Sequence, residues 1–265
     1  MTQDYSQIVN QPFLYINDMK VSNNATTPNT KLDIAAGICR DSTNTYDINL
    51  GNYLDMLASG TANSSTTLDA GTTGVDGLDT GTLGATKIYY VYVISDPVSG
   101  NATGTILSLA APSTGPLMPF GYSASRHIGY AFTSAGSVFL AFYQAGNNNA
   151  RSYCYDAPRA TAVTAGAATS YTAVSLANLV PPLENTPVNV NFAFTPGAAS
   201  RTLKMTPGNG TGDFVTITGQ VTSVVISDNV MVLSKVTSAV PEIDYKVSNG
   251  DSAVAINVAG FDFYI

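Results

Sequence analysis

The chain contains a single histidine, His127, so any site that needs an imidazole base has to use this residue. Serine and cysteine nucleophiles are activated by a histidine within hydrogen-bonding distance, which a third side chain orients. The surrounding stretch 126–130 (RHIGY) is typical of a strand, on which His127 would make local hydrogen bonds. We therefore expect no nucleophilic catalysis, and zinc-type clusters are excluded by the shortage of His and Cys ligands.

Paired carboxylates are a second chemistry to consider, because glycosidases flank the scissile bond with two acids. The chain has only two glutamates, Glu184 and Glu242, beside its aspartates. Many aspartates, such as Asp76, Asp228 and Asp251, fall at expected turns, where Asx hydrogen bonds account for them. We expect no catalytic residues and no enzymatic activity.

Two loops resemble ligand loops in part. Residues 69–79 carry three aspartates among glycines and could bind Ca²⁺, but they lack the ligand spacing and closing glutamate of an EF-hand. Residues 208–212 (GNGTG) match a phosphate loop in glycine content only, since no lysine or helix follows, so a hairpin turn is favoured. The sequence predicts neither a metal site nor a cofactor.

Cysteines and aromatic residues favour structural roles. A disulfide between Cys39 and Cys154 stays open, although two isolated cysteines are more typical of buried free thiols. The chain has 15 tyrosines and no tryptophan, which lowers the expectation of a sugar-binding platform without eliminating it. The tyrosines at 89, 90 and 92 are expected in the core or at a subunit interface.

The composition excludes several classes of function. Charged residues make up 11% of the chain, against roughly 25% in a typical soluble domain. The net charge is −7, and the 11 Lys and Arg residues are scattered, so the basic patch that nucleic acid or an anionic membrane requires is missing. No apolar run suits a membrane span and no signal peptide is recognisable at the N-terminus, so we expect neither.

Alternating apolar and polar residues predict half-buried antiparallel strands at 46–50, 188–194 and 243–247. Two runs, 88–94 (IYYVYVI) and 138–143 (VFLAFY), are apolar on both faces. Each run is expected to be either a central strand covered on both sides or a strand whose outer face meets another subunit. The second alternative is the basis of the assembly hypothesis below.

Turn residues support the same fold class. Asp228-Asn229, Asn249-Gly250 and Gly219-Gln220 each separate two strand-like runs and predict hairpins. Helical signals are sparse: residues 52–57 could form a turn or two, and 174–180 are ambiguous. The sequence therefore predicts an all-β protein.

Two breaks divide the chain. Residues 59–86 form a long Thr/Gly/Ser-rich stretch that is expected to be a loop packed on another surface. The Asn-rich stretch 146–160 is expected to join two antiparallel β modules. The modules would be an attachment or assembly domain at 1–155 and a jelly-roll-like β-sandwich at 156–265.

A series of motifs in the first module resembles a known family. In chain order they are KLDIAAGICRDSTNTYDINLG (31–51), GLDTG (77–81), YYVYVISD (89–96), GTILS (104–108), PFGY (119–122) and RHIG (126–129). Over about residues 10–145 the chain resembles tailed-bacteriophage virion structural proteins of the tail-fibre-like, appendage or decoration kind. This resemblance implies a particle component, usually a homotrimer, and carries over no catalytic residue. Within the first motif, Arg40 to Asn44 is expected to form a structural Asx-type turn, with Arg40 paired to a carboxylate or carbonyls.

The leading hypothesis is a structural subunit of a phage particle that acts by subunit assembly. Its partners would be two further copies and other virion proteins at the tail, collar or capsid, and its location the virion. The alternative is a host-receptor or glycan-binding module that uses loops of the C-terminal sandwich. A polysaccharide-degrading enzyme is the third and weakest hypothesis.

Overall fold

The computed structural model describes residues 15–51, 66–98, 102–208, 210 and 212–265. Within these ranges the chain contains strands and turns and no helix, so the expected all-β class is confirmed. No helix in this described part is long and apolar enough to cross a membrane. The expected helical turn at 52–57 lies outside the described residues.

The chain divides into two compact units, one of residues 1–151 with 264–265 and one of residues 152–263. The sequence places the boundary after residue 155, in an Asn-rich linker. The structure instead has one continuous strand there, β12 (Ala150–Ala160), whose alternating buried side chains include Tyr153 and Tyr155. Asparagines are poor strand formers, but those of the segment precede β12 in chain order and do not interrupt it.

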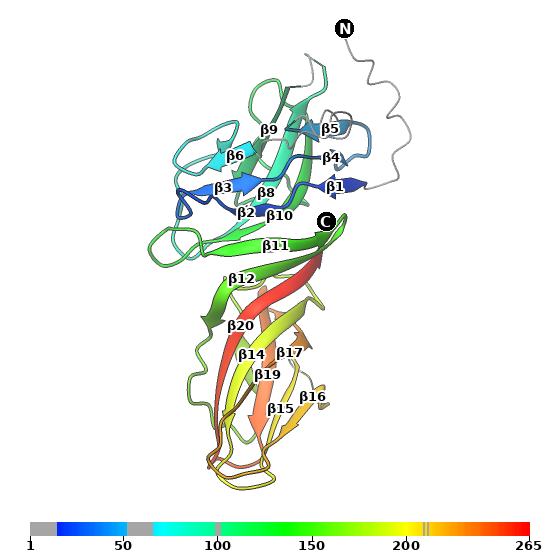
Figure 1. Cartoon of the computed structure of the whole chain (residues 1–265). Coiled ribbons are helices and arrows are strands. Elements are labelled where there is room, and N and C mark those ends of the chain that lie inside the picture. The colour runs from blue at the N-terminus through cyan, green and yellow to red at the C-terminus, as the bar shows by residue number, and fades with distance from the viewer. Residues whose placement is uncertain (1–14, 52–65, 99–101, 209, 211) are drawn as a thin grey trace, which may run out of the picture. The chain divides into compact units, whose positions relative to one another are not determined.

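The first unit is built from short sheets (Figure 1). The first has the order β1-β4-β5, with β1 at Ile16–Asp18, β4 at Gly37–Arg40 and β5 at Asp47–Leu50. The second has the order β10-β8-β9-β7, with β10 at Ala124–Phe132, β8 at Ile88–Asp96, β9 at Ala102–Ser108 and β7 at Gly77–Leu78. A further group of strands pairs in the order β11-β2-β3-β6, with β11 at Phe142–Asn147, β2 at Val21–Asn23, β3 at Lys31–Ile34 and β6 at Thr66–Asp69.

The apolar run 88–94 forms the central strand β8, between β10 and β9. Every side chain from Val91 to Ile94 is buried by the chain itself, on both faces of the sheet. A second copy is therefore not needed to cover this strand, and that part of the assembly hypothesis is wrong. The run is apolar on both sides because it lies inside its own unit.

The second apolar run, 138–143, is not the expected central strand. Its regular part begins only at Phe142 in β11, and before that Phe139 makes an isolated bridge to Thr133. Phe139 and Phe142 are buried, whereas Tyr143 is 52% exposed. A turn at 135–137, in which Ser137 has a φ of 54°, comes directly before the run, and residues 140 and 141 are not part of a strand.

The long loop expected at 59–86 contains two strands in its described part, β6 and β7. β6 pairs with β3, and β7 pairs with β9 in parallel. Residues 174–180, which the sequence leaves ambiguous, end strand β13 (Thr172–Ser175) and continue into a turn.

The second unit has two four-stranded sheets with the orders β12-β20-β14-β17 and β13-β19-β15-β16. Besides β12 and β13, their bounds are β14 Pro187–Thr195, β15 Thr202–Pro207, β16 Val215–Thr218, β17 Ile226–Leu233, β19 Val240–Val247 and β20 Ala253–Tyr264. A short extra strand, β18 (Lys235–Thr237), pairs with β19. Counted without β18, the first strand pairs with the eighth, the second with the seventh, the third with the sixth and the fourth with the fifth. This is the strand order of a jelly roll, as expected.

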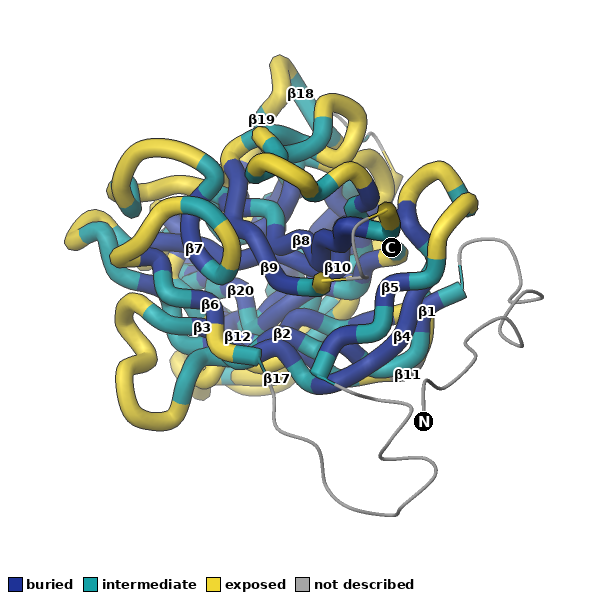
Figure 2. The backbone as a smooth tube through the Cα atoms, turned by 90° about the horizontal axis from the view of Figure 1, so that it is seen from above, coloured by how far each residue is buried: buried dark blue, intermediate teal, exposed yellow. Residues whose placement is uncertain are grey.

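The core of the jelly roll follows from strict alternation. On β14 the side chains of Val188, Val190, Phe192 and Phe194 are buried, and the residues between them are half-buried. On β19 and β20 the apolar side chains are buried in the same alternating way. In Figure 2 the residues of the strands are mostly buried or intermediate, and the exposed residues lie mostly in the connecting loops. Each sheet thus buries one face, and the two buried faces supply one core.

The three expected hairpins of this unit are not formed. Asp228 and Asn229 lie within β17, opposite Phe192 and Asn191 of β14. The segments around Gly219 and Gly250 are turns, but each joins strands of different sheets, β16 to β17 and β19 to β20. The residues at Gly219 and Gly250 favour a turn, but the sheet that the next strand joins is decided by the packing of the complete jelly roll.

Candidate ligand-binding pocket

A parallel pairing in the first unit brings two separate motifs together. Gly77 and Leu78 of β7 lie opposite Ile106 and Leu107 of β9. The N–H of Asp79 donates to the carbonyl of Leu107 at 2.9 Å. Asp79, just after β7, therefore lies beside Ser108 at the end of β9.

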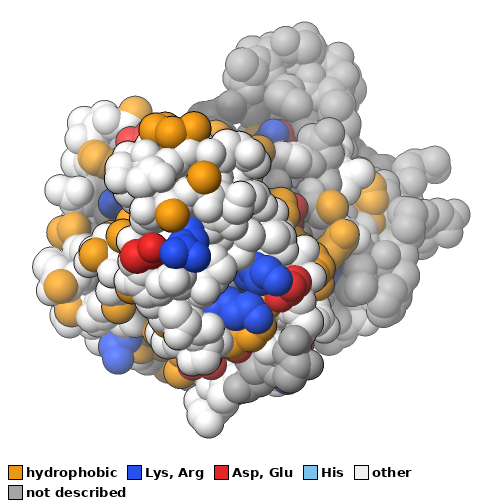
Figure 3. All heavy atoms as spheres, turned by 90° about the horizontal axis from the view of Figure 1, so that it is seen from below, with side chains coloured by type: hydrophobic (Ala, Val, Ile, Leu, Met, Phe, Trp, Pro, Cys, Tyr) orange, Lys and Arg blue, Asp and Glu red, His pale blue; other side chains and the backbone are white. Residues whose placement is uncertain are grey.

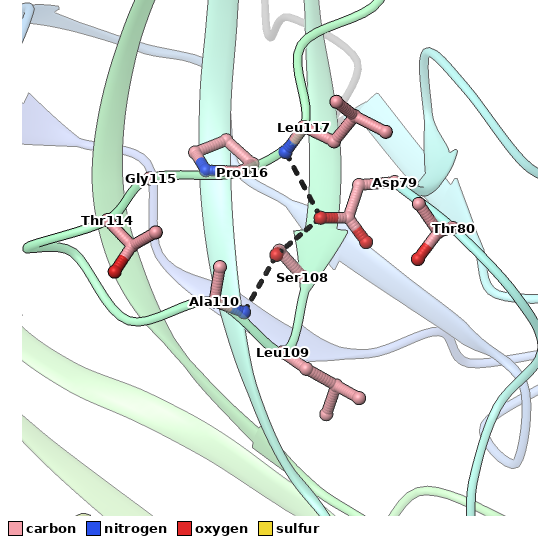
Figure 4. Close-up of a pocket in the computed structure, with 9 residues that line it drawn as sticks. All are labelled: Asp79, Thr80, Ser108, Leu109, Ala110, Thr114, Gly115, Pro116 and Leu117. Carbon is pink, nitrogen blue, oxygen red and sulfur yellow. Dashed lines mark hydrogen bonds between the residues drawn. The ribbon is translucent and has the colours of Figure 1, made fainter.

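Hydrogen bonds fix the Asp79 carboxylate in one position (Figure 4). Its Oδ2 accepts from Ser108 Oγ at 2.5 Å and from the backbone N–H of Leu117 at 3.2 Å. Ser108 Oγ in turn accepts from the N–H of Ala110 at 2.9 Å. This network ties β7, β9 and the loop after β9 together around one carboxylate.

A second carboxylate is held in a similar way three residues earlier in each of the two segments. Asp76 Oδ1 accepts from the N–H of Thr105 at 2.8 Å and from its Oγ1 at 2.9 Å. A Cβ at Gly77 would lie 2.6 Å from the carbonyl oxygen of Thr72, so this position has no room for a side chain, and Gly81 has a φ of 73°, which favours glycine. The two glycines of the motif 77–81 therefore allow the backbone conformation that places Asp79 beside β9.

Asp79 lies at the edge of an open pocket with a volume of about 480 Å³. Hydroxyl groups of Thr80 and Thr114 and the aliphatic side chains of Leu109 and Leu117 also line it. Ser108 is fully buried, whereas Leu109 and Leu117 are 54% and 64% exposed. Among the described residues that line the pocket there is no Lys, Arg or His, so nothing there neutralises Asp79.

An aromatic cluster lies on the neighbouring strands β8 and β10. The ring of His127 lies 4.8 Å from that of Tyr130 and 5.6 Å from those of Tyr90 and Tyr92, measured between centroids. Tyr92 donates its hydroxyl to the carbonyl of Ala110 at 2.8 Å, which links the cluster to the pocket loop. Burial raises the pKa of the Tyr92 and Tyr130 hydroxyls, so both stay protonated.

His127 is a buried core residue on β10, as its strand-like surroundings predict. Burial lowers the pKa of His127 to about 3, although a hydrogen bond with the backbone of Gly129 acts to raise it. Its Nε2 has no hydrogen-bond partner in the described part of the chain. A neutral, enclosed imidazole with no adjacent carboxylate is not placed as a general base.

We expect His127 to make the protein sensitive to mild acid. Because its folded pKa, about 3, is below the unfolded value of about 6.5, its contribution is full above pH 6.5 and is lost as the pH falls toward 3. The loss is about 1.4 kcal/mol per pH unit, or about 2 kcal/mol at pH 5. Urea unfolding at about pH 7.5 and about pH 5 should show this loss in the native protein and not in His127→Phe. Equal losses in both proteins would contradict it.

The other candidate residues are dispersed. Glu184 is exposed on the loop before β14, and Glu242 lies on β19. Asp69 pairs with Lys31 at 2.8 Å and does not turn toward Asp76 or Asp79, each of which has its own donors. In the described ranges no group of three or more His, Cys, Asp or Glu is arranged to hold a metal ion.

Further expectations concern the thiols and the second glycine-rich loop. Cys39 and Cys154 are both free, and burial raises the pKa of the Cys39 thiol to about 12. Residues 208–212, of which 209 and 211 are not described, connect β15 to β16. These two strands pair antiparallel, so the segment is the hairpin connection that the sequence predicts.

The turn at 40–44 is confirmed. The Asp41 carboxylate accepts hydrogen bonds from the backbone N–H groups of Thr43, Thr45 and Tyr46. Burial alone would raise its pKa, but these bonds and that of the Thr43 hydroxyl lower it below the usual value. Arg40 donates to Asp47 at 3.0 Å and to the carbonyl of Asn44 at 2.7 Å.

Sequence reasoning missed Arg151, which lies in the segment interpreted as a linker. Its side chain is 2% exposed and donates mainly to backbone carbonyls. Nη1 donates to Met19 at 2.9 Å and to Ile128 at 3.2 Å, Nε to Asn148 at 3.1 Å, and Nη2 to Asp18. No sequence pattern marks such a residue, because its acceptors are distant main-chain atoms.

No protein-family model and no curated protein matches the sequence. Among solved structures, the exo-beta-1,3-galactanase of Phanerochaete chrysosporium with galactose is similar at 14% identity. The alignment covers 92% of this chain and 67% of that one, with a TM-score of 0.21. A similarity this low carries no argument about the fold or the activity of this chain.

Proposed function

We propose that this chain is a structural subunit of a phage particle and acts by assembling with copies of itself and with other virion proteins. The observation that carries the proposal is a group of exposed apolar residues on the jelly roll. It consists of Phe214, Val221, Val224, Val225 and Met231, each between 42% and 58% exposed. These residues lie next to or on the two edge strands β16 and β17 or in the loop between them, and we call them the β16–β17 flank.

The edge strands of this flank lack the usual protection against pairing. Monomeric proteins guard sheet edges with lysine, proline or bulges. β16 (VTIT) contains no charged residue or proline, and β17 (ISDNVMVL) contains only Asp228. The register of β17 with β14 is regular along all eight residues. An edge without such protection is open to pairing with another chain, which a subunit interface uses and a monomer avoids.

The low charge of the chain supports close packing of identical copies. On the face that Figure 3 displays, Lys and Arg side chains lie beside acidic ones, with apolar and uncharged polar groups around them. Several of the charged groups of the jelly roll neutralise each other, as in the pairs Arg201–Asp251 and Lys204–Asp213. Symmetric copies of a highly charged subunit would repel one another. The trimeric state and the position at tail, collar or head are proposed from the family resemblance.

Light scattering coupled to size exclusion tests the assembly proposal. At micromolar concentration we expect about three times the chain mass of 27.5 kDa. The double substitution Val224→Asp and Met231→Asp should release monomers, because burying two carboxylates in an apolar interface is costly. Val98→Asp, at an exposed apolar residue of the first unit, is the matched control and should leave the mass unchanged. A native protein that is a stable monomer would overturn the proposal.

A further inference from the structure

We propose that the Asp79 pocket binds a saccharide through a fixed carboxylate and two aliphatic walls. The site differs from the sandwich loops to which the sequence assigns a possible glycan site. It lies in the first unit, away in sequence from the β16–β17 flank, so this proposal does not rest on the assembly proposal. The argument comes from the hydrogen bonding, the charge and the shape of the pocket.

The carboxylate is set up to accept hydrogen bonds from a ligand. Oδ2 of Asp79 is occupied by Ser108 and Leu117. Oδ1 has no hydrogen-bond partner in the described part of the chain and points away from Ser108, on the Thr80 side (Figure 4). Because the internal network already orients the group, a ligand does not have to order it on binding, which favours affinity.

The charge of the site excludes anionic ligands. No described cationic side chain lines the pocket, so a phosphate or a ligand carboxylate would meet an uncompensated negative charge. A ligand that fits must donate hydrogen bonds to Asp79. The hydroxyl groups of Thr80 and Thr114 can both donate and accept, and they supply further contacts at the rim.

The walls require an apolar surface on the same ligand. Leu109, Pro116 and Leu117 present aliphatic carbon to the pocket, and both leucines are more than half exposed in the free protein. A pyranose ring combines hydroxyl donors at its edge with a C–H face that covers such carbon. The volume of about 480 Å³ falls within the range of ligand pockets, about 300–1,000 Å³.

The test is a titration of the full-length ¹⁵N-labelled chain with methyl glycosides of glucose, galactose, mannose, rhamnose and N-acetylglucosamine. We expect amide shifts confined to 77–81 and 108–117 for at least one glycoside. Asp79→Asn should weaken that binding about tenfold, as expected for loss of a charged acceptor. The control Asp69→Asn changes an acid of the same loop that pairs with Lys31 outside the pocket, and should bind as the native protein does.

A second variant separates ligand contact from loop support, since Asp79 also holds the loop at Leu117. Thr114→Val keeps the shape and removes a hydroxyl, so we expect several-fold weaker binding with an unchanged melting temperature. Native-like binding by Thr114→Val, or no shift with any glycoside, would overturn the proposal. So would shifts at these residues with n-butylamine alone, because that result would assign the pocket to a cationic partner. The oligomeric mass is measured separately, so failure of this proposal leaves the assembly proposal unaffected.

Discussion

Arg151→Met should destabilise the first unit by about 3–5 kcal/mol, the range found when one partner of a buried polar network is removed. The guanidinium is the donor for carbonyls of Asp18, Met19, Ile128 and Asn148 and for the side chain of Gln144. Methionine fills a similar volume but leaves these buried acceptors without donors. Burial lowers the pKa of Arg151 to about 10, so the native side chain is still charged at neutral pH.

The backbone around Arg151 explains why no other side chain can replace it. Asp18 and Met19 have φ values of 58° and 62°, in the left-handed region that non-glycine residues avoid. Their carbonyls both accept from Arg151, so the guanidinium helps to hold an unfavourable backbone conformation. Arg151→Lys should lose nearly as much stability as Arg151→Met, because an ammonium has three donors and lacks the planar fork.

Hydrogen exchange and urea unfolding measure the effect of Arg151→Met. Exchange should accelerate for amides of β2 and β10, which carry or adjoin the acceptors, and much less for those of β14 in the second unit. Lys87→Met, at an exposed lysine of the same unit, is the control and should change stability by less than about 0.5 kcal/mol. Stability of Arg151→Met within about 0.5 kcal/mol of that control, the scatter expected between independent sites, would show that the network is dispensable.

Gly260→Ala should destabilise the jelly roll by on the order of 3 kcal/mol, since overpacking a close backbone contact displaces the backbone. A Cβ at this position would lie 2.1 Å from the carbonyl oxygen of Tyr153 and 3.3 Å from the Cα of Cys154. The carbonyl belongs to β12, the first strand of the roll, and Gly260 to β20, the last. The substitution therefore acts on the strand pair that closes the roll.

A β-bulge accounts for the glycine. Asn189 of β14 lies opposite Gly260, while Val190 lies opposite Val258, so Ala259 has no partner in the register. A bulge bends its strand and increases the local twist, and a glycine in a strand often marks a bulge or a close approach of another backbone. At Gly260 the approaching backbone is that of Tyr153 on β12. Exchange at the amides of β12 and β20 should accelerate most in Gly260→Ala.

Gly212→Ala is the matched control for Gly260→Ala. A Cβ at Gly212 would meet nothing within 4 Å, and its φ is not in the left-handed region. We expect a stability change of less than about 0.5 kcal/mol for this control. Equal amide exchange rates in Gly260→Ala and Gly212→Ala would contradict the close contact between β12 and β20.

The distribution of apolar residues was only partly readable from the sequence. Alternation correctly marked β5, β14 and β19, because burial of one sheet face imposes a period of two on each strand. It also showed that 88–94 is covered on both sides, but it could not show that the same chain provides the cover. The exposed apolar residues of the β16–β17 flank, such as Val224 and Met231, carry no local mark that separates them from core residues.

The sequence alone determined the all-β class, the strand faces and the turn at Asp41, since each depends on residues adjacent in the chain. Only the tertiary structure decided the jelly-roll strand order, in which Asp228 and Asn229 continue a strand despite their turn preference. It also decided the pocket, where Asp79 meets Ser108 across 29 positions, and the Arg151 network, which reaches back 133 positions to Asp18. Local propensity ranks the conformations of a few residues, whereas strand order and buried polar contacts depend on which distant segments share a core.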